Sequence, residues 1–360
     1  MRIEDLEQSL RHIATLDETD DHLITAVLDC TGGRSAIRQR LQQRIRPVLT
    51  DLPADRRHSL DEARTRIERW IDDDLAADTR GAVVYARGGG DPVFLPLEFR
   101  VEMSREAVVV DTLPSVYDLC ALKDAFHRYV VLLCTEDSMR ILEVHLGAVT
   151  RQIWKERPEI RRRVGREWTR EHYRNHRRDR TQRFVKEMIG VLEARTDTGG
   201  YQHLVLAGVP RLLAQVRDAL PGRLREIVID QLPASGRTSV EDVVTATLST
   251  FVEEEQRESL SLVDALFDAL YRDGLAVVGA RRCLAALEHD QADLLIMAHD
   301  YDTDGREPIL RAAQRRGCTV EFVGGNDRLD RVGGVGCLLR YRPPSMTLDS
   351  LELRTVEGGN

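Results

Sequence analysis

The chain has 360 residues, 42% of them hydrophobic, and a formal net charge of -8 at pH 7. This length exceeds one ordinary core and predicts two or three domains. No apolar run approaches the ~20 residues that span a bilayer, and the N-terminal sequence is unlike a signal peptide, so we expect a cytoplasmic protein without a membrane anchor. The six cysteines form no C-x-x-C pair, which favours free thiols over a zinc site or a disulfide framework.

The first part of the chain, 1–120, is predicted to form an α/β domain. Strands are expected at 22–29, 81–85, 92–95, 99–103 and 107–111, and helices at 34–50 and 56–77. The second helix is indicated by apolar residues that recur at helical spacing. Three consecutive glycines at 88–90 predict a hairpin turn, because they lack the lysine and hydroxyl residue of a phosphate-binding loop and precede no helix.

The middle part, 121–236, is predicted to form a mixed sheet with helices packed on it. Strands are expected at 129–134, 139–144, 203–207 and 226–229, a basic loop and long helix at 151–195, and a further helix at 211–220. The first two strands should form a hairpin, since turn residues separate two apolar runs. Gly199 and Gly200 are expected to end the first helix.

The last part, 237–345, alternates between helical and strand-like patterns, which predicts a three-layer α/β/α domain. Helices are expected at 239–273, 280–288 and 307–316, and strands at 293–297, 318–323 and 335–341. Ser239, with Asp242 shortly after it, predicts an N-cap of the long helix and not a catalytic nucleophile. The tail, 346–360, is predicted to be loose.

One segment departs from the acidic composition of the chain. Residues 151–186 hold fourteen Lys and Arg against five Asp and Glu, a charge of +9, so the other 324 residues carry -17. Glutamates inside the segment allow intrahelical ion pairs, which is typical of a solvated helix. Five acids cannot neutralise fourteen bases, however, and the remaining cations repel one another, which favours an anionic partner. Aromatic residues among the arginines are typical of surfaces that bind unstacked nucleic-acid bases.

Several stretches of the sequence resemble the archaeo-eukaryotic peptide chain release factors and the Pelota family, in particular their bacterial relatives. They are Leu-Val-Leu-Ala-Gly at 204–208, Gly-Leu-Ala-Val-Val-Gly-Ala-Arg-Arg-Cys at 274–283, Ala-Asp-Leu-Leu-Ile at 292–296 and Leu-Asp-Arg-Val-Gly-Gly-Val-Gly at 329–336. The resemblance implies three domains, with an RNase H-like mixed sheet in the middle and a C-terminal α/β/α domain similar to kink-turn-binding ribosomal proteins. Residues 1–20 and 343–360 lie outside it.

In release factors of this family, the loop before the long helix of the middle domain carries Gly-Gly-Gln, whose glutamine helps to position the water that hydrolyses peptidyl-tRNA. Many bacterial relatives have Gly-Gly-Trp-Ser-Gln there. Gly165 and Trp168 match that pattern, whereas Arg166 stands for the second glycine and Arg170 for the glutamine. The resemblance therefore implies RNA contact at this loop without hydrolysis. A Gly-Gly-Tyr-Gln sequence at 199–202 is interpreted as a helix end and turn, because it follows the long helix.

We therefore predict a translation-associated protein that binds the ribosome, through rRNA or tRNA, and is not hydrolytic. The predicted RNA-binding residues share the basic loop and helix and are Arg161, Arg162, Arg163, Gly165, Arg166, Trp168, Arg170, Arg174, Arg177 and Arg178. On the helix the arginines recur three or four residues apart, so one face can meet several phosphates. Trp168 is equally compatible with stacking on a base and with anchoring the helix.

Two alternatives remain open: a peptidyl-tRNA hydrolase or ribosome-rescue factor with a remodelled loop, and a protein–protein scaffold whose basic arm meets an acidic partner. The C-terminal domain is a candidate surface for a protein partner. No cofactor or metal is expected, because His172 and His176 lack a third ligand. The aspartates at 300, 302 and 304 likewise lack a well-placed glutamate for a calcium loop.

Overall fold

The computed structural model describes residues 3–51, 54–126, 128–135, 138–156, 170–199, 201–272, 274–301 and 303–341. Within these ranges, the side chains of 170–177 and of a few other residues are not described. The chain divides into two compact units, Met1–Arg257 and Glu258–Asn360. In the described ranges, three sheets are each built from a consecutive stretch of chain, which confirms the predicted α/β fold. No helix in these ranges is both long and apolar enough to cross a bilayer.

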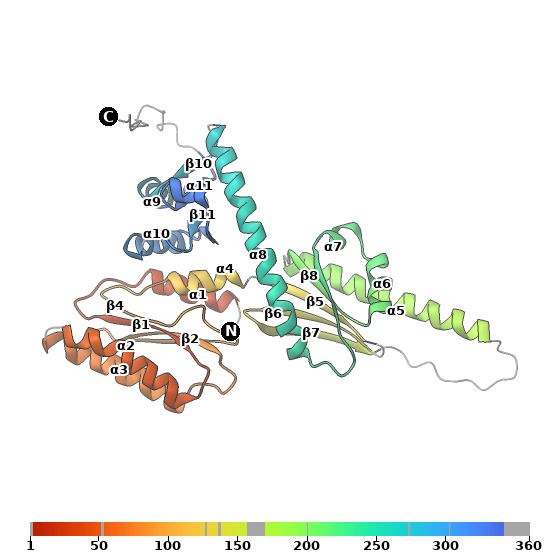
Figure 1. The fold of residues 1–360 in the computed structure, drawn as a ribbon, viewed down its shortest axis with the longest axis horizontal. Helices are drawn as coiled ribbons and strands as arrows, with labels where there is room; N and C mark the ends of the chain where they lie inside the picture. Colours follow the sequence, from red (N-terminus) through yellow and green to blue (C-terminus); the bar gives the residue numbers. More distant parts are fainter. Residues whose placement is uncertain are drawn as a thin grey trace. The chain divides into compact units, whose positions relative to one another are not determined.

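The first stretch forms a four-stranded antiparallel sheet with helices on both faces (Figure 1). In chain order its elements are α1 (Ile3–Ala14), β1 (Leu23–Asp29), α2 (Arg34–Asp51), α3 (Ala54–Asp73), β2 (Gly81–Arg87), β3 (Val93–Phe99), β4 (Ala107–Asp111) and α4 (Tyr117–Ala125). The strand order is β3-β2-β1-β4. Alternate residues of β1, Ile24, Ala26 and Leu28, pack in one apolar cluster with α2 and α3. In Figure 1, α1 and α4 lie along the opposite face.

The separate strand expected at 99–103 is wrong. β3 ends at Phe99, and the partner of Phe99 across the ladder is Gly81, the first residue of β2. Beyond that pair β2 offers no further residue, and Val101 is buried within a bend instead. Apolar residues after Phe99 therefore serve the core without extending the sheet.

The glycine turn between β2 and β3 is confirmed. Gly89 has a φ of +79°, a backbone conformation that favours glycine. Its amide donates to the Glu62 carboxylate at 3.1 Å, and the amide of Gly90 donates to the Asp21 carboxylate at 3.3 Å. Because the protein's own carboxylates bind these amides, the turn is not arranged to hold a phosphate.

The middle stretch forms the predicted mixed sheet, with five strands where the sequence predicted four. Its elements are β5 (Tyr129–Cys134), β6 (Ser138–His145), β7 (Ala148–Glu156), α5 (Arg170–Gly199), β8 (His203–Gly208), α6 (Pro210–Ala219), α7 (Gly222–Glu226) and β9 (Val228–Pro233). The order is β7-β6-β5-β8-β9, in which β5, β8 and β9 run parallel and β6 runs antiparallel to both of its neighbours. α5 and α6 cover one face of this sheet (Figure 1).

The start predicted for the basic loop and helix, at 151, is too early. Residues 151–156 belong to β7, whose ladder with β6 runs from the Glu143–Arg151 pair to the Ser138–Glu156 pair. Cross-strand pairing at the sheet edge therefore overrides the helical propensity of the arginines. The predicted end of α5 at Gly199 is confirmed, whereas the strand expected at 226–229 begins only at Val228 because α7 precedes it.

The last stretch forms the predicted three-layer α/β/α arrangement. Its elements are α8 (Val240–Tyr271), β10 (Ala276–Val278), α9 (Ala280–Glu288), β11 (Ala292–Ala298), α10 (Thr303–Arg316), β12 (Thr319–Val323), α11 (Asp327–Arg331) and β13 (Val335–Leu339). The strand order is β10-β13-β11-β12, and only β11 and β12 are parallel among these pairs. The second half of α8 and α11 cover one face, whereas α9 and α10 pack against the other.

The long helix α8 contributes to two cores. Its first half adds Val243, Val244 and Phe251 to the core of the five-stranded sheet, and its second half adds Val263, Leu266 and Phe267 to that of the last sheet.

The N-cap predicted for α8 is confirmed. The Ser239 hydroxyl accepts from the Asp242 amide at 3.0 Å, and the Asp242 carboxylate accepts from the Ser239 amide at 3.4 Å. This reciprocal pair is a capping box and leaves Ser239 no catalytic arrangement.

A buried tyrosine links the five-stranded sheet to α8. The Tyr129 hydroxyl lies 2.9 Å from the Thr247 hydroxyl, which itself donates to the carbonyl of Val244 at 2.8 Å. Since the single Thr247 proton is used in that bond, Tyr129 is the donor to Thr247. Burial raises the pKa of Tyr129 from 10.0 to about 12, although the bond with Thr247 opposes this shift.

Stability should therefore fall at alkaline pH through Tyr129. The unfolded chain loses this proton near pH 10, whereas the folded protein keeps it to about pH 12, so unfolding is favoured as the pH rises between these values. In that window the difference in unfolding free energy between wild type and Tyr129→Phe should shrink by about 1.4 kcal/mol per pH unit. Urea unfolding at about pH 9, 10 and 11 tests this, and a difference independent of pH would contradict it.

Candidate nucleic-acid interface

The basic segment, 151–186, includes most of an edge strand and the first half of a long helix. Its first residues belong to β7, the outermost strand of the five-stranded sheet, and its last residues belong to α5. Figure 1 shows that the first part of α5 extends past the end of this sheet.

Most of the predicted RNA-binding residues fall outside the part of the chain that the structure describes. These are Arg161, Arg162, Arg163, Gly165, Arg166 and Trp168. Arg170, Arg174 and Arg177 lie on the first turns of α5, where side chains are not described, and Arg178 is exposed. The predicted arginine stripe therefore stays a prediction, as do the two roles considered for Trp168.

The rest of α5 separates an apolar face from a charged one. Phe184, Met188 and Leu192 are buried against the sheet at helical spacing. Four exposed cations follow the first turns; we call them the α5 cations: Arg178, Arg180, Arg183 and Lys186. None of the four forms an ion pair with a carboxylate of the described residues. Their charges are therefore left to solvent or to a partner.

Other cations nearby are neutralised within the fold. Arg195 of α5 donates through Nε and Nη2 to one carboxylate oxygen of Glu143 on β6, at 2.8 and 2.6 Å. Lys155 of β7 is paired with Glu187 of α5. These ion pairs connect the sheet to α5, so Glu143 and Glu187 are already neutralised by cations of the fold.

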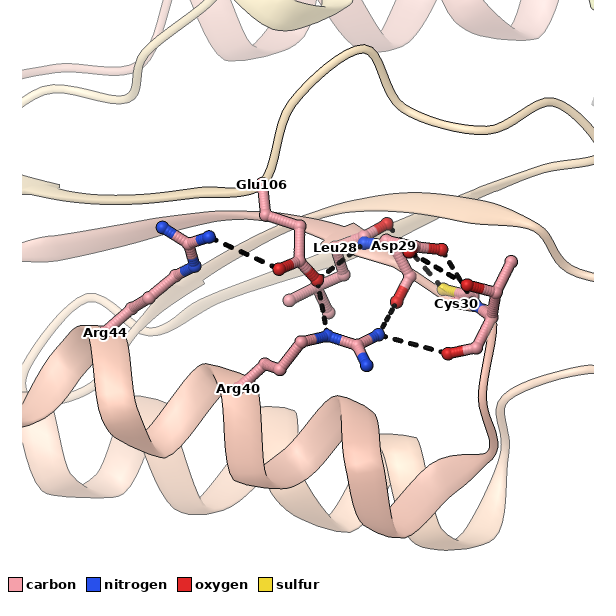
Figure 2. Close-up of polar contacts among 7 residues, drawn as sticks. Leu28, Asp29, Cys30, Arg40, Arg44 and Glu106 are labelled. Carbon is pink, nitrogen blue, oxygen red and sulfur yellow. Dashed lines mark hydrogen bonds and ion pairs between the residues drawn. The ribbon is translucent and has the colours of Figure 1, made fainter.

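A second group of arginines, on helix α2 beside the first sheet, also has its charges neutralised within the fold (Figure 2). Arg40 and Arg44 of α2 converge on the two carboxylate oxygens of Glu106, at 2.7 and 3.3 Å. Arg40 also donates to the Asp29 carbonyl at 2.6 Å. Burial, helped by the charge of Asp29, raises the pKa of the neighbouring Cys30 thiol to about 12, so this cysteine is a poor nucleophile. This network is structural, in contrast to the α5 cations.

Two residues that the sequence did not single out as a pair meet beside the basic segment. Arg140 of β6 stands directly opposite Trp154 of β7 in the ladder, and its guanidinium carbon lies 5.8 Å from the centre of the indole ring. Trp154 is 52% exposed. The aromatic residues of the basic segment pointed to Trp154 as a possible contact. Its partner Arg140 lies outside that segment and is identified only by the strand register.

The Gly-Gly-Tyr-Gln sequence behaves as a helix end. α5 ends at Gly199, and a Cβ on this residue would lie 2.1 Å from the Tyr201 ring. The Tyr201 amide donates to the Thr196 carbonyl, and its ring packs against the core of the sheet. Burial, with the charge of Glu143 as a smaller cause, raises the pKa of Tyr201 to about 12. The close approach of the Tyr201 ring therefore explains why residue 199 is a glycine, without a catalytic role.

Other chemistries find little support in the described residues. No group of three His, Cys, Asp or Glu side chains there is placed to hold a metal ion. The side chains of His172, His176 and Asp304 are not described, and Asp302 lies outside the described ranges. The six cysteines are free, as predicted, and all except Cys30 are buried.

The middle of the chain matches a known family. Residues 114–251 match the family described as Bacterial archaeo-eukaryotic release factor family 10. A protein pelota homolog of Methanothrix thermoacetophila is 29% identical over 174 residues, which are 45% of this chain and 49% of that protein. The match thus spans about half the length of this curated relative.

Two solved structures also align with most of this chain, at low identity. Dom34 of S. cerevisiae shows 11% identity and a TM-score of 0.41, over 95% of this chain and 94% of that chain. Pelota of Archaeoglobus fulgidus shows 14% identity and a TM-score of 0.38, over 95% and 93% of the two chains.

The matched residues hold the five-stranded sheet, the basic segment and the first part of α8. The release-factor-like stretch at 204–208 lies on β8 within this range. The resemblance predicted from the sequence is therefore confirmed. The middle part of the chain, residues 114–251, is thus similar to the bacterial archaeo-eukaryotic release factors.

Proposed function

We propose that this protein is a translation-associated factor of the cytoplasm that binds the ribosome through rRNA or tRNA, using residues 151–186, and does not hydrolyse peptidyl-tRNA. The observation that carries the proposal is the set of α5 cations, which are exposed and lack ion-pair partners among the described residues. Clustered unpaired cations favour a phosphate backbone, because binding releases its counterions. The overall charge of -8 limits this attraction to the basic segment.

The ribosome is the partner to test first because of the family. An archaeal Pelota has been described in a ribosome-bound model with ABCE1. For this chain, the arginines at 166 and 170 stand where the family's hydrolytic members have a glycine and a glutamine, which supports binding without hydrolysis. A ribosome-rescue factor that occupies stalled ribosomes is compatible with the same residues.

Co-sedimentation with ribosomes at low and high salt tests the binding. Pelleting should be clear at about 50 mM salt and lost at about 200 mM, since contacts with six or more phosphates lower the affinity by roughly 10³-fold or more over this range. A protein that does not pellet, or that pellets equally at both concentrations, would count against an RNA contact and favour a protein scaffold.

Release of labelled peptide from loaded ribosomes tests the chemistry. The proposed function predicts no release above the rate without protein, because Arg170 cannot orient water as a glutamine amide does. Release that saturates with protein would instead establish a peptidyl-tRNA hydrolase with a remodelled loop. A Gly-Gly-Gln release factor supplies the positive control.

A further inference from the structure

We propose that Trp154 and Arg140 form a stacking platform for one unpaired RNA base at the edge of the middle sheet. The proposal rests on the proposed function, in which residues 151–186 meet RNA, and it assigns a base contact where that function requires only phosphate contacts. Unpaired bases stack on exposed aromatic rings and on guanidinium planes, whatever their sequence.

The strand register creates the platform. Arg140 and Trp154 are directly opposite each other in an antiparallel pair, so both side chains leave the same face of the sheet. The guanidinium carbon lies 5.8 Å from the ring centre, within the range of a cation–π contact. The next pair on the same face is Leu142 opposite Gln152. Leu142 belongs to the apolar cluster that includes residues of α8, so Arg140 and Trp154 lie on the α8 side of the sheet.

The indole ring is not used by the core. Ile153, the preceding residue, points to the opposite face and packs against the cluster below α5. Trp154 itself belongs to neither of the two apolar clusters that the described residues form on this sheet, and it stays 52% exposed. About half of this large apolar side chain is therefore left in contact with solvent, and that exposed part is available for a ligand.

The charge around the platform selects a base over a phosphate. Arg140 has no ion pair with the described residues, and its buried Nε has no hydrogen-bond acceptor, so the ring holds the guanidinium in place. Glu156, also exposed, shares this face two residues after Trp154 and repels a phosphate.

Two short RNA probes separate base stacking from phosphate attraction. One is an unstructured, fluorescently labelled oligoribonucleotide, and the other is an abasic oligomer with the same number of phosphates. For the full chain, Trp154→Ala should weaken binding of the first by roughly 5- to 150-fold and leave binding of the second unchanged. Trp154→Phe should restore most of the loss, because a smaller aromatic ring still stacks. Tyr271→Ala, which removes another exposed aromatic at 79% exposure, should change neither affinity.

Several outcomes would overturn the platform. Equal losses for both probes would mean that Trp154→Ala disturbs the fold or the charges, and no loss for either would mean that the ring meets no base. Reduced ribosome pelleting of Trp154→Ala with unchanged RNA binding would indicate a protein contact instead. If wild type binds neither probe at low salt, the proposed RNA contact fails together with the platform. Salt-sensitive binding that is equal in wild type and Trp154→Ala removes the platform alone.

Discussion

Replacing all four α5 cations with glutamine should cost the protein most of its salt-dependent affinity for ribosomes. Each phosphate contact adds roughly 0.7 to 0.9 to the slope of log affinity against log salt, so losing four should reduce that slope by about 3. Between about 50 and about 200 mM salt, the affinity of wild type should then fall roughly a hundredfold more than that of the variant. The affinities can be measured by titrating labelled protein with ribosomes across this range.

A matched control separates local contacts from overall charge. Four other exposed arginines, each paired with a carboxylate, are Arg80, Arg100, Arg316 and Arg340. Replacing them with glutamine changes the net charge equally but removes cations that the fold already neutralises, and exposed pairs of this kind contribute only about 0–1 kcal/mol. This control should keep the slope of wild type. If both variants lose slope equally, the α5 cations are not a specific contact surface.

The sheets were largely predictable from the sequence because their central strands are buried on both faces. Every residue of β5 is buried, so 129–134 is an uninterrupted apolar run, and the neighbouring β8 is similar. β7 was missed for the opposite reason. Most of its residues are exposed, so Arg151 and Lys155 could not be told from the arginine run that follows and were assigned to the basic loop and helix. An edge strand has a weak apolar pattern in the sequence, and β7 is recognised as a strand only through its pairing with β6.

The candidate interface was predictable in charge but not in pairing. The count of +9 over 151–186 identified the segment. Which cations remain free depends on contacts across the sheet: Lys155 finds Glu187, and Arg195 finds Glu143, far apart in sequence. The pairing of Arg140 with Trp154 likewise depends on the strand register, which composition and spacing do not determine.

The largest stability effect is expected from Phe251→Ala, which should lower the free energy of unfolding by about 3–5 kcal/mol. Phe251 is fully buried and stacks on Tyr129, with ring centres 4.6 Å apart and planes inclined by 19°. The edge of His203 meets it at 5.4 Å. Truncation leaves a cavity between α8 and the sheet, and both aromatic contacts are lost with the buried area. Ser249→Ala, an exposed change on the same helix, should stay within about 0.5 kcal/mol of wild type.

Tryptophan fluorescence can assign this loss to one part of the molecule. The three tryptophans, Trp70, Trp154 and Trp168, all lie in the first compact unit, Met1–Arg257. Urea unfolding followed by fluorescence therefore reports that unit, whereas far-ultraviolet circular dichroism reports both. Phe251→Ala should move the fluorescence midpoint to lower urea and leave a later dichroism transition in place. A common shift of both signals would instead mean that α8 couples the two units into one cooperative transition, and an unchanged fluorescence midpoint would mean that Phe251 does not hold α8 to the middle sheet.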